Sequence, residues 1–292
     1  MARKIVIADN MEDEVVAEIK KLGDVTYKPA NLMEAVKDAE IIVVRSATKV
    51  TKEVIAGAPK LKAVARAGVG IDNIDSVACK ARGIQVINTP GASTNAVAEL
   101  TIGLIIAASR KIGKAYLQMK NGVWDKKALV GNEIQGKTLG IVGYGRIGKA
   151  VAEKARALGM NVIAFDPFAR SDQHTKIVDI DTLLHQSDVI SIHSILTPET
   201  RNLFNKASIE KMKTGAIIVN VARGEIVDED ALYDALKSGK VKAAALDVTA
   251  NEPYKGKLLE LDNVVFSSHI GGNTMEAQLK IGSELVQRLR EL

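Results

Sequence analysis

The sequence predicts an α/β protein with two parallel-sheet domains, Rossmann-like or flavodoxin-like, and a cleft between them. Short apolar runs alternate with helical patterns over the first 90 residues, and the alternation restarts after about residue 135. A glycine-rich turn at Ile141–Ala150 lies at the start of the second series. A chain of 292 residues suits about two domains of ordinary size.

The first series contains four apolar runs typical of buried strands, with short helical patterns between them. The runs are KIVIAD, EIIVVRSA, LKAVARAG and IQVINT, and EDEVVAEIKKLG has a helical spacing that ends on a glycine. Strands separated by helices indicate right-handed βαβ units, and therefore a parallel sheet.

A long helix is predicted from Ser93 to Asn121, and a loop follows it to about residue 135. The second series then places strands at KTLGIVG, NVIAFD, DVISIHS, GAIIVNVA, AAALDV and NVVFSSH. Helices are predicted between most of these strands, and a final helix is predicted from about Thr274.

Composition argues against several classes of protein. The net charge is +5, basic residues are scattered among acidic ones, and aromatic residues make up only 3%, so nucleic-acid binding is not predicted. The single Cys79 offers neither a disulfide nor a thiol pair, and we predict no metal site. The most apolar segment, from Ala96, carries Glu99 and is too short to cross a bilayer, and the N-terminus lacks a signal-peptide pattern. We therefore expect a cytoplasmic protein that binds small anionic molecules.

The glycines of the central turn have the G-x-G-x-x-G spacing of a dinucleotide-binding site, between a strand and a helix. Gly143 allows the tight turn, Gly145 lets a pyrophosphate approach the backbone, and Gly148 lets the helix pack on the sheet. The helix N-terminus then offers N–H groups to the phosphates. The next strand ends in Asp166, whose carboxylate can accept ribose hydroxyls and would repel a 2′-phosphate. The predicted cofactor is therefore NAD.

Three charged residues come after later strands, at the edge where open α/β sheets place their ligands. Arg223 follows IIVNVA, Glu252 lies in the loop after AALDV, and His269 follows VVFSS. A lone arginine or histidine in such a place is more often structural. The three together, in one nucleotide-binding domain, indicate a catalytic set.

These segments resemble the D-isomer-specific 2-hydroxyacid dehydrogenases, and most of all their D-3-phosphoglycerate dehydrogenase branch. Seven motifs occur in the family's order from about residue 40 to 275: VVRSATKVT, VARAGVGIDNID, NTPGASTNAVAELT, GKTLGIVGYGRIGKAVA, VNVARGEIVDEDAL, AALDVTANEP and SHIGG. The resemblance implies oxidation of a D-2-hydroxy acid to the 2-keto acid, or the reverse, with NAD. The expected substrate is 3-phosphoglycerate, in serine biosynthesis.

The resemblance also assigns the catalytic roles. The nicotinamide would take the hydride, and His269 would take the hydroxyl proton, since imidazole exchanges protons near neutral pH. Glu252 would bind the other ring nitrogen, fix the tautomer and strengthen the base. Arg223 would bind the substrate carboxylate and polarise the C2 oxygen, because a guanidinium forms a planar fork and stays charged.

Further cofactor contacts are implied by the same resemblance. His193 would lie near the cofactor without transferring a proton, and Asp247 would lie near the nicotinamide carboxamide. At His193 the family often has the sequence His-x-Pro, whereas in this chain Ser194 and Ile195 follow the histidine. Packing around the cofactor is therefore expected to differ in detail. The additional contacts expected are Arg146, Ile147, His193, Thr197, Pro198, Ala222 and Asp247.

The first domain lacks a G-x-G-x-x-G turn after its first strand, and we expect it to bind the substrate. Its glycine loop follows a strand and can present backbone N–H groups to a carboxylate, a role that the resemblance also gives it. Two arginines near one anion favour a phosphorylated acid. The expected substrate-binding residues are Arg45, Ser46, Arg66, Ala67, Gly68, Val69 and Gly70.

The substrate domain is expected to take residues 1–91 and 273–292, and the NAD-binding domain residues 92–272. Both crossings contain glycines, which suits hinges, so we expect the cleft to close around its ligands. The resemblance places a homodimer interface on the 93–121 helix and the 121–135 loop. Many members of this branch carry a C-terminal serine-sensing domain. This chain ends at Leu292 in a helical pattern, so we expect that domain to be absent, either in a short family member or in a truncated chain.

Two alternatives stay open. Glyoxylate and hydroxypyruvate reductases share the fold and also carry an arginine or its equivalent in the first domain. NADH-sensing corepressors of the same superfamily keep the cofactor fold and even the catalytic residues. A peptide-docking segment or a long disordered tail would favour a corepressor, and the sequence shows neither.

Overall fold

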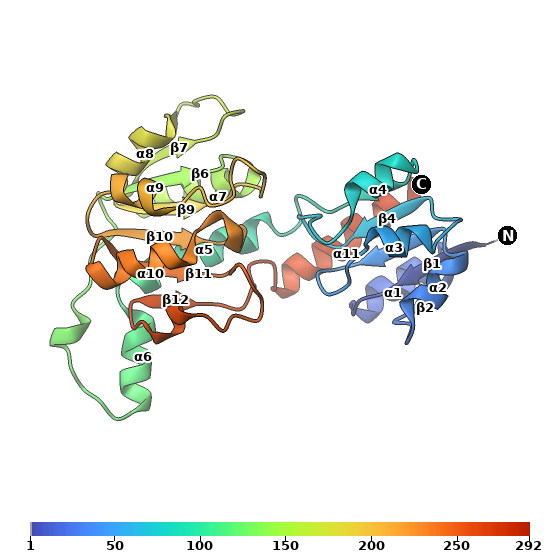
Figure 1. The fold of residues 1–292 in the computed structure, drawn as a ribbon, viewed down its shortest axis with the longest axis horizontal. Helices are drawn as coiled ribbons and strands as arrows, with labels where there is room; N and C mark the ends of the chain where they lie inside the picture. Colours follow the sequence, from blue (N-terminus) through green and yellow to red (C-terminus); the bar gives the residue numbers. More distant parts are fainter. Residues whose placement is uncertain (1) are drawn as a thin grey trace. The chain divides into compact units, whose positions relative to one another are not determined.

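The computed structural model describes residues 2–292, which form two compact α/β units. The first unit takes the chain up to Thr94 and returns at Gly272–Leu292, and the second unit is Asn95–Gly271. Each unit is built around one sheet whose strands all run parallel (Figure 1). The predicted fold class, two parallel-sheet α/β domains, is confirmed.

The sheet of the first unit has the strand order β2-β1-β3-β4-β5. The strands are β1 (Arg3–Ile7), β2 (Gly23–Tyr27), β3 (Ile41–Val44), β4 (Ala63–Arg66) and β5 (Gln85–Ile87). The helices are α1 (Asp13–Lys20), α2 (Leu32–Ala35), α3 (Lys52–Ala56), α4 (Ser76–Ala81) and α11 (Met275–Arg290).

Helices cover both faces of this sheet. Ile5 and Val43 pack with α1 and α11 on one face, and Ile42 and Val44 pack with α3 and α4 on the other. Every residue of β3 is buried, as expected for the centre of a parallel sheet covered on both sides. Cys79 of α4 lies in this core, where burial raises the pKa of its thiol.

The sheet of the second unit has the strand order β12-β11-β10-β9-β6-β7-β8. The strands are β6 (Thr138–Val142), β7 (Asn161–Phe165), β8 (Lys176–Ile177), β9 (Val189–Ile192), β10 (Ala216–Asn220), β11 (Val241–Leu246) and β12 (Val264–Phe266). The helices are α5 (Thr94–Ser109), α6 (Ile112–Lys120), α7 (Arg146–Ala157), α8 (Ile180–Gln186), α9 (Lys206–Lys211) and α10 (Glu229–Ser238). One core joins the sheet to α5 and α7, and the other joins it to α8, α9 and α10.

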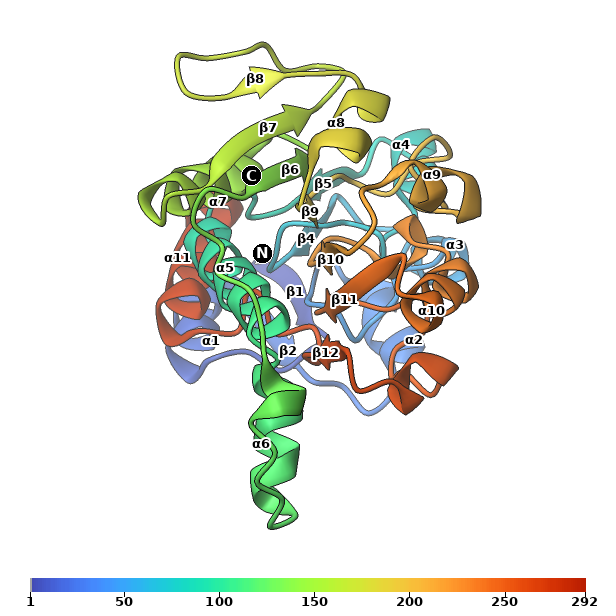
Figure 2. The ribbon, with the colours of Figure 1, turned by 90° about the vertical axis from the view of Figure 1, so that its left-hand side faces the viewer.

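The prediction of one helix over residues 93–121 is wrong, because the structure contains two. The carbonyl oxygen of Ser109 accepts a hydrogen bond from the N–H of Asn132 at 2.9 Å, and a Cβ on Gly131 would lie 2.6 Å from that oxygen. The returning segment therefore binds the end of α5, and Lys111, with a φ of +54°, begins a new direction. Figure 2 shows α6 extending away from the rest of its unit.

Within the described residues, none of the helices combines the length and the apolar character needed to cross a bilayer.

Candidate active site

The glycine turn follows β6 and leads into α7, at the point where the strand order of the second sheet reverses. Gly143 has a φ of +95°, and a Cβ there would lie 2.6 Å from the backbone nitrogen of Ser194. A Cβ on Gly148 would lie 2.2 Å from the carbonyl oxygen of Gly143, whereas one on Gly145 would meet no atom within 4 Å. Two glycines therefore allow close backbone packing, and the third leaves open space beside the turn.

The N-terminus of α7 suits a pyrophosphate. Gly145 is the N-cap and provides no side-chain hydrogen bond to the first turn, which begins with Arg146 and Ile147. The N–H groups of this turn therefore add to the positive end of the dipole of a 12-residue helix. With the open space at Gly145, these residues fit the diphosphate of a dinucleotide.

Asp166 follows β7, and two backbone N–H groups fix its carboxylate. One oxygen accepts from Tyr144 at 2.8 Å and the other from Phe168 at 2.9 Å. Because an ionised carboxylate has about four lone-pair directions, the fixed group can still accept further hydrogen bonds. Its position near the glycine turn fits the ribose hydroxyls of NAD.

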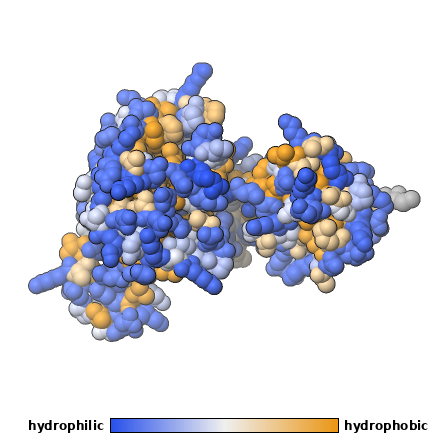
Figure 3. Space-filling view, viewed as in Figure 1, coloured by the Kyte–Doolittle hydropathy of each residue, from blue (hydrophilic) through white to orange (hydrophobic). Residues whose placement is uncertain are grey.

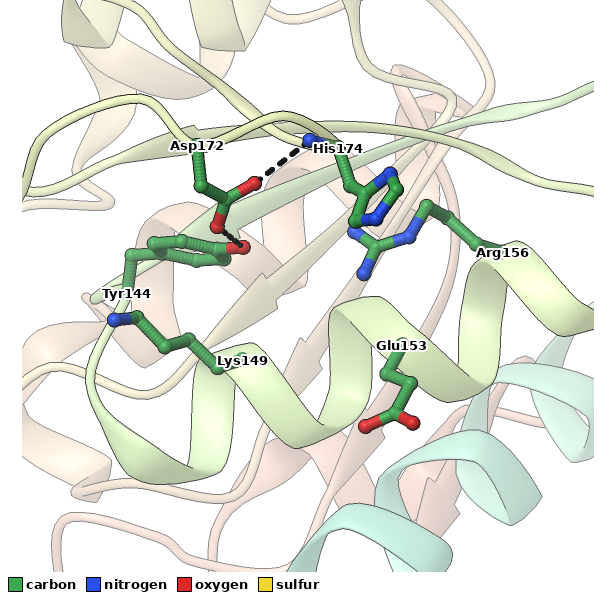
Figure 4. Close-up of a pocket in the computed structure, with 6 residues that line it drawn as sticks. All are labelled: Tyr144, Lys149, Glu153, Arg156, Asp172 and His174. Atoms are coloured by element: carbon green, nitrogen blue, oxygen red, sulfur yellow. Dashed lines mark hydrogen bonds between the residues drawn. The ribbon is translucent and has the colours of Figure 1, made fainter.

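Tyr144 supports this part of the site, a role that the sequence motif does not indicate. Its ring is buried in the core beside α7, and its hydroxyl donates to Asp172 at 2.8 Å (Figure 4). Arg156 of α7 donates to Thr175 at 2.7 Å. These bonds hold the segment after Asp166 against α7. The pocket of about 430 Å³ drawn in Figure 4 contains none of the predicted site residues.

His193 follows β9, and its surroundings exclude it from proton transfer. Its Nε2 lies 2.8 Å from Ser191 Oγ, and its Nδ1 is buried without a hydrogen-bond partner among the described residues. Burial lowers the pKa of His193 to about 3, so the ring is neutral at physiological pH. The hydroxyl of Ser194 is buried and unpaired in the same sense. Thr197 and Pro198 follow in the same loop.

Arg223 follows β10, and the buried Asn220 at the end of that strand shapes its turn. Asn220 Nδ2 donates to the carbonyl of Arg223 at 2.8 Å, and Asn220 Oδ1 accepts from the N–H of Ala222 at 3.0 Å. A guanidinium nitrogen of Arg223 also donates to the carbonyl of Ala222 at 2.6 Å. One side-chain amide thus closes the turn in both directions and fixes the backbone that carries Arg223.

His269 follows β12 on a loop that Asp247 holds. The Asp247 carboxylate, 2% exposed, accepts from Ser267 Oγ at 2.6 Å and from the N–H groups of Ile270 at 2.9 Å and Gly271 at 3.0 Å. His269 has a φ of +55°, and its N–H donates to the carbonyl of Asp247 at 2.8 Å. The structure thus uses Asp247 to shape the loop that carries His269. Its contact with the nicotinamide carboxamide stays a prediction.

Glu252 and His269 are in direct contact. His269 Nδ1 lies 2.9 Å from Oε2 and 3.1 Å from Oε1 of Glu252. Because an ionised carboxylate only accepts, Nδ1 carries the proton and Nε2 is left to accept one. Both side chains are 44% exposed. Arg223 follows β10, Glu252 follows β11 and His269 follows β12, so the anion-binding cation and the proton acceptor with its partner come after three successive strands of one sheet.

In the first unit, Arg45 and Ser46 follow β3, and Arg66 is the last residue of β4. The Arg45 guanidinium donates to the carbonyl of Asn10 at 3.2 Å and to Gln278 Oε1 at 2.6 Å. Arg66 Nε donates to the carbonyl of Arg45 at 3.2 Å. The structure thus brings the two arginines together, and both already have partners within the unit.

The loop after β4 offers fewer backbone N–H groups than its sequence suggests. The N–H of Ala67 donates to the carbonyl at the end of β3 at 2.9 Å, and that of Gly68 donates to Thr89 Oγ1 at 2.9 Å. The N–H groups of Val69 and Gly70 have no acceptor among the described residues. Only these two of the four predicted donors are therefore open to a carboxylate.

The sequence of the chain is similar to those of known proteins. The sequence profile described as "D-isomer specific 2-hydroxyacid dehydrogenase, NAD binding domain" matches residues 102–271. A hydroxypyruvate reductase of Thermotoga maritima is 51% identical over 263 residues, which are 88% of this chain and 86% of that protein. A D-3-phosphoglycerate dehydrogenase of Methanocaldococcus jannaschii is 45% identical over 99% of this chain and 57% of that protein.

The fold of the chain is also similar to those of solved structures. The D-lactate dehydrogenase of Aquifex aeolicus, complexed with NAD and lactic acid, superposes with a TM-score of 0.89 at 31% identity, covering 99% of this chain and 94% of that one. The chain spans a little over half the length of the phosphoglycerate dehydrogenases that it matches, with 57% and 55% of two of them covered.

Proposed function

Because the chain belongs to the D-isomer specific 2-hydroxyacid dehydrogenases, we propose that it oxidises 3-phosphoglycerate to 3-phosphohydroxypyruvate with NAD and catalyses the reverse. The contact of His269 Nδ1 with Glu252 at 2.9 Å carries the proposal, because it leaves Nε2 as a proton acceptor. With this substrate the protein would serve serine biosynthesis in the cytoplasm.

The residues divide the work as follows. Bound NAD supplies a hydride acceptor. His269 Nε2 takes the proton of the substrate hydroxyl, while Glu252 stabilises the positive ring that forms. Arg223 binds the substrate carboxylate through its planar guanidinium. His193 takes no part in proton transfer, because its pKa is lowered to about 3.

Two observations support a phosphorylated substrate. Arg45 and Arg66 lie together in the first unit, where Arg66 Nε bonds the backbone of Arg45 at 3.2 Å. The M. jannaschii relative, which matches 99% of this chain, is named a D-3-phosphoglycerate dehydrogenase. The Arg45 guanidinium bonds a carbonyl and an amide and has the Glu12 carboxylate at 3.8 Å. A phosphate would compete with these partners, because it carries more charge than a single carboxylate and makes strong charge-assisted bonds.

A second candidate is reduction of hydroxypyruvate or glyoxylate. It is favoured by the T. maritima hydroxypyruvate reductase, of which the chain covers 86%, whereas it covers 57% of the M. jannaschii dehydrogenase. Steady-state assays with NAD and 3-phosphoglycerate, and with NADH and hydroxypyruvate or glyoxylate, separate the two. Formation of NADH from 3-phosphoglycerate supports the first proposal. Fast reduction of hydroxypyruvate or glyoxylate without turnover of 3-phosphoglycerate supports the second, and no turnover of any acid contradicts both.

The proposal includes a homodimer formed through α6 and the loop that follows it. α5 is largely buried within its own unit. Of the predicted interface over residues 93–121, we therefore propose only the part formed by α6. Figure 3 shows apolar residues in the region of α6 and the loop that follows it. The most exposed large hydrophobic residues of this region are Tyr116, Leu117, Met119, Trp124 and Val130. Scattering-detected size exclusion of Leu117→Glu tests it, with the exposed Val77→Glu of the first unit as control. A dimer that both variants keep would contradict this interface.

A further inference from the structure

The loop that carries Glu252 needs support from outside, because its residues 249–256 belong to no helix or strand. One support is a close contact with the loop of Arg223. A Cβ on Gly224 would lie 1.9 Å from the carbonyl carbon of Thr249 and 2.1 Å from the nitrogen of Ala250. The two backbones therefore touch, and only glycine permits this approach.

A hydrogen bond from α10 adds a second support. Glu229, the first residue of that helix, accepts from the N–H of Ala250 through Oε1 at 2.9 Å. Ala250 lies two residues before Glu252, so the bond fixes the backbone just ahead of the side chain that orients His269. Removal of the Glu229 carboxylate would take this hydrogen-bond acceptor away from the Ala250 N–H.

The other side of the loop is held by an aromatic contact. The ring of Tyr254 stacks on Phe266, with 5.7 Å between ring centres and 27° between planes. Phe266 ends β12, three residues before His269. Glu252 thus lies midway between two fixed points, one bonded to α10 and the other packed on the strand that leads to its partner.

The setting of Glu229 is costly for a carboxylate. Partial burial raises the pKa of Glu229, and the negative charges of Asp230, Asp228 and Glu225 raise it further, while the bond from Ala250 lowers it. A carboxyl group kept in such surroundings is a candidate for a functional task.

We propose that Glu229 is a positioning residue, which holds the Glu252 loop through Ala250 and so keeps Nδ1 of His269 protonated. Its effect on turnover rests on the proposed function, whereas its effect on the imidazole tautomer does not. A carboxylate at a helix N-terminus also stabilises its helix. That role alone predicts lower stability and an unchanged tautomer.

The test reads the tautomer of His269 from imidazole ¹⁵N chemical shifts, at a pH where the ring is neutral. The chain has four histidines, and His269→Asn identifies the signal. We expect the Nδ1–H form in the wild type, a mixture in Glu229→Ala, and the wild-type form in Glu229→Gln, which keeps an oxygen acceptor. Asp230→Ala is the matched control, since its carboxylate contacts Lys257 at 2.9 Å. An unchanged tautomer in Glu229→Ala would overturn the proposal.

Two further measurements keep the outcome decisive. If Glu229→Ala does not fold by near-ultraviolet circular dichroism, Glu229→Asp takes its place, because it withdraws the carboxylate by one methylene, and we expect the same mixture of tautomers. In folded Glu229→Ala, kcat should fall about tenfold or more through misplacement of the base, with NADH affinity unchanged. A tautomer change in a protein that turns over none of the acids would uphold the positioning role and reject the proposed function. Normal turnover by the wild type, together with an unchanged tautomer in Glu229→Ala, would uphold the proposed function and reject the positioning role.

Discussion

The two units present the same topological feature and use it in opposite ways. In the first sheet the strand order reverses between β1 and β3, and in the second it reverses between β6 and β9. Open parallel sheets bind ligands in the crevice at the carboxyl ends of such strands. The difference between the two crevices therefore explains why only one of them suits a dinucleotide.

In the second unit, glycine keeps the crevice open. Gly143 packs against the backbone after β9, and Gly145 leaves free space at the uncapped start of α7. In the first unit, Asp9 after β1 fills the equivalent place. Its carboxylate accepts from the N–H of Arg45 at 2.6 Å and from the N–H and hydroxyl of Thr48 at 3.2 and 2.5 Å.

In both units the parallel topology provides a crevice, and the residue after the first strand decides what enters it. A glycine leaves N–H groups available to an outside anion. An aspartate provides the anion from within the chain, and Asp9 binds N–H groups of the loop after β3 and so fixes that loop. In this protein the fixed loop carries Arg45, one of the residues proposed to bind substrate.

The largest expected effect separates binding in the second crevice from the chemistry beside it. His269→Asn should lower kcat by about 10²-fold or more, because general-base catalysis contributes that much. NADH affinity, measured by fluorescence titration, should stay at the wild-type value. Loss of NADH binding would show that the crevice and the base are not separate, and full turnover would remove His269 as the base.

Gly143→Ala tests the open crevice directly. The new Cβ would lie 2.6 Å from the nitrogen of Ser194, so the turn or the end of β9 must move. Such overpacking typically costs about 1–3 kcal/mol, and we expect NADH affinity to fall about tenfold, the equivalent of 1.4 kcal/mol. Gly215→Ala is the control, since Gly215 also has a positive φ, +84°, but its Cβ would meet nothing within 4 Å. Equal losses in both variants would attribute the effect to backbone strain alone.

Asp9→Ala tests the filled crevice. It leaves the N–H groups of Arg45 and Thr48 without their carboxylate, and an unsatisfied buried donor costs about 1–3 kcal/mol. We expect lower stability in urea and a higher KM for the acid substrate, with NADH affinity unchanged. Asp24→Ala, at an exposed position of β2, serves as control. A variant that gains NADH affinity would contradict the view that Asp9 only fixes a loop.

The sequence was sufficient for the fold class because parallel strands buried on both faces, such as Ile41–Val44, read as continuous apolar runs. The sequence was also sufficient to predict the glycine turn between β6 and α7, because the spacing of its glycines is a local feature. The break between α5 and α6 was missed, since it depends on Gly131 and Asn132, more than twenty residues after Ser109.

The supports of the site were missed for the same physical reason. Asn220, Glu229, Asp247 and Asp9 are polar side chains whose partners are mainly backbone N–H or carbonyl groups. Most of those partners lie on distant loops, and no periodicity or spacing specifies them. The sequence gives the residue types at strand ends, and only the three-dimensional arrangement shows whether each one faces a ligand or holds a neighbouring loop.

The smallest expected effect concerns the stability of the second unit and its pH dependence. The pKa of Glu229 is raised in the folded chain, chiefly by burial, so the folded state binds a proton more tightly than the unfolded state. The ionised carboxylate therefore destabilises the fold above its folded pKa, and this penalty fades as the pH falls toward the ordinary carboxyl value. Glu229→Gln carries no such penalty and keeps an acceptor for Ala250. At pH 7 we expect Glu229→Gln to have a slightly higher Tm than the wild type. The corresponding gain in the free energy of unfolding should be less than about 1 kcal/mol, because the group is half-exposed. Near pH 4 we expect no difference in Tm. Glu276→Gln, at an exposed first-turn position of α11, should show no such gain. A Tm advantage that grows as the pH falls would mean that Glu229 is stabilising as an anion, and the cost inferred from its acidic surroundings would be wrong.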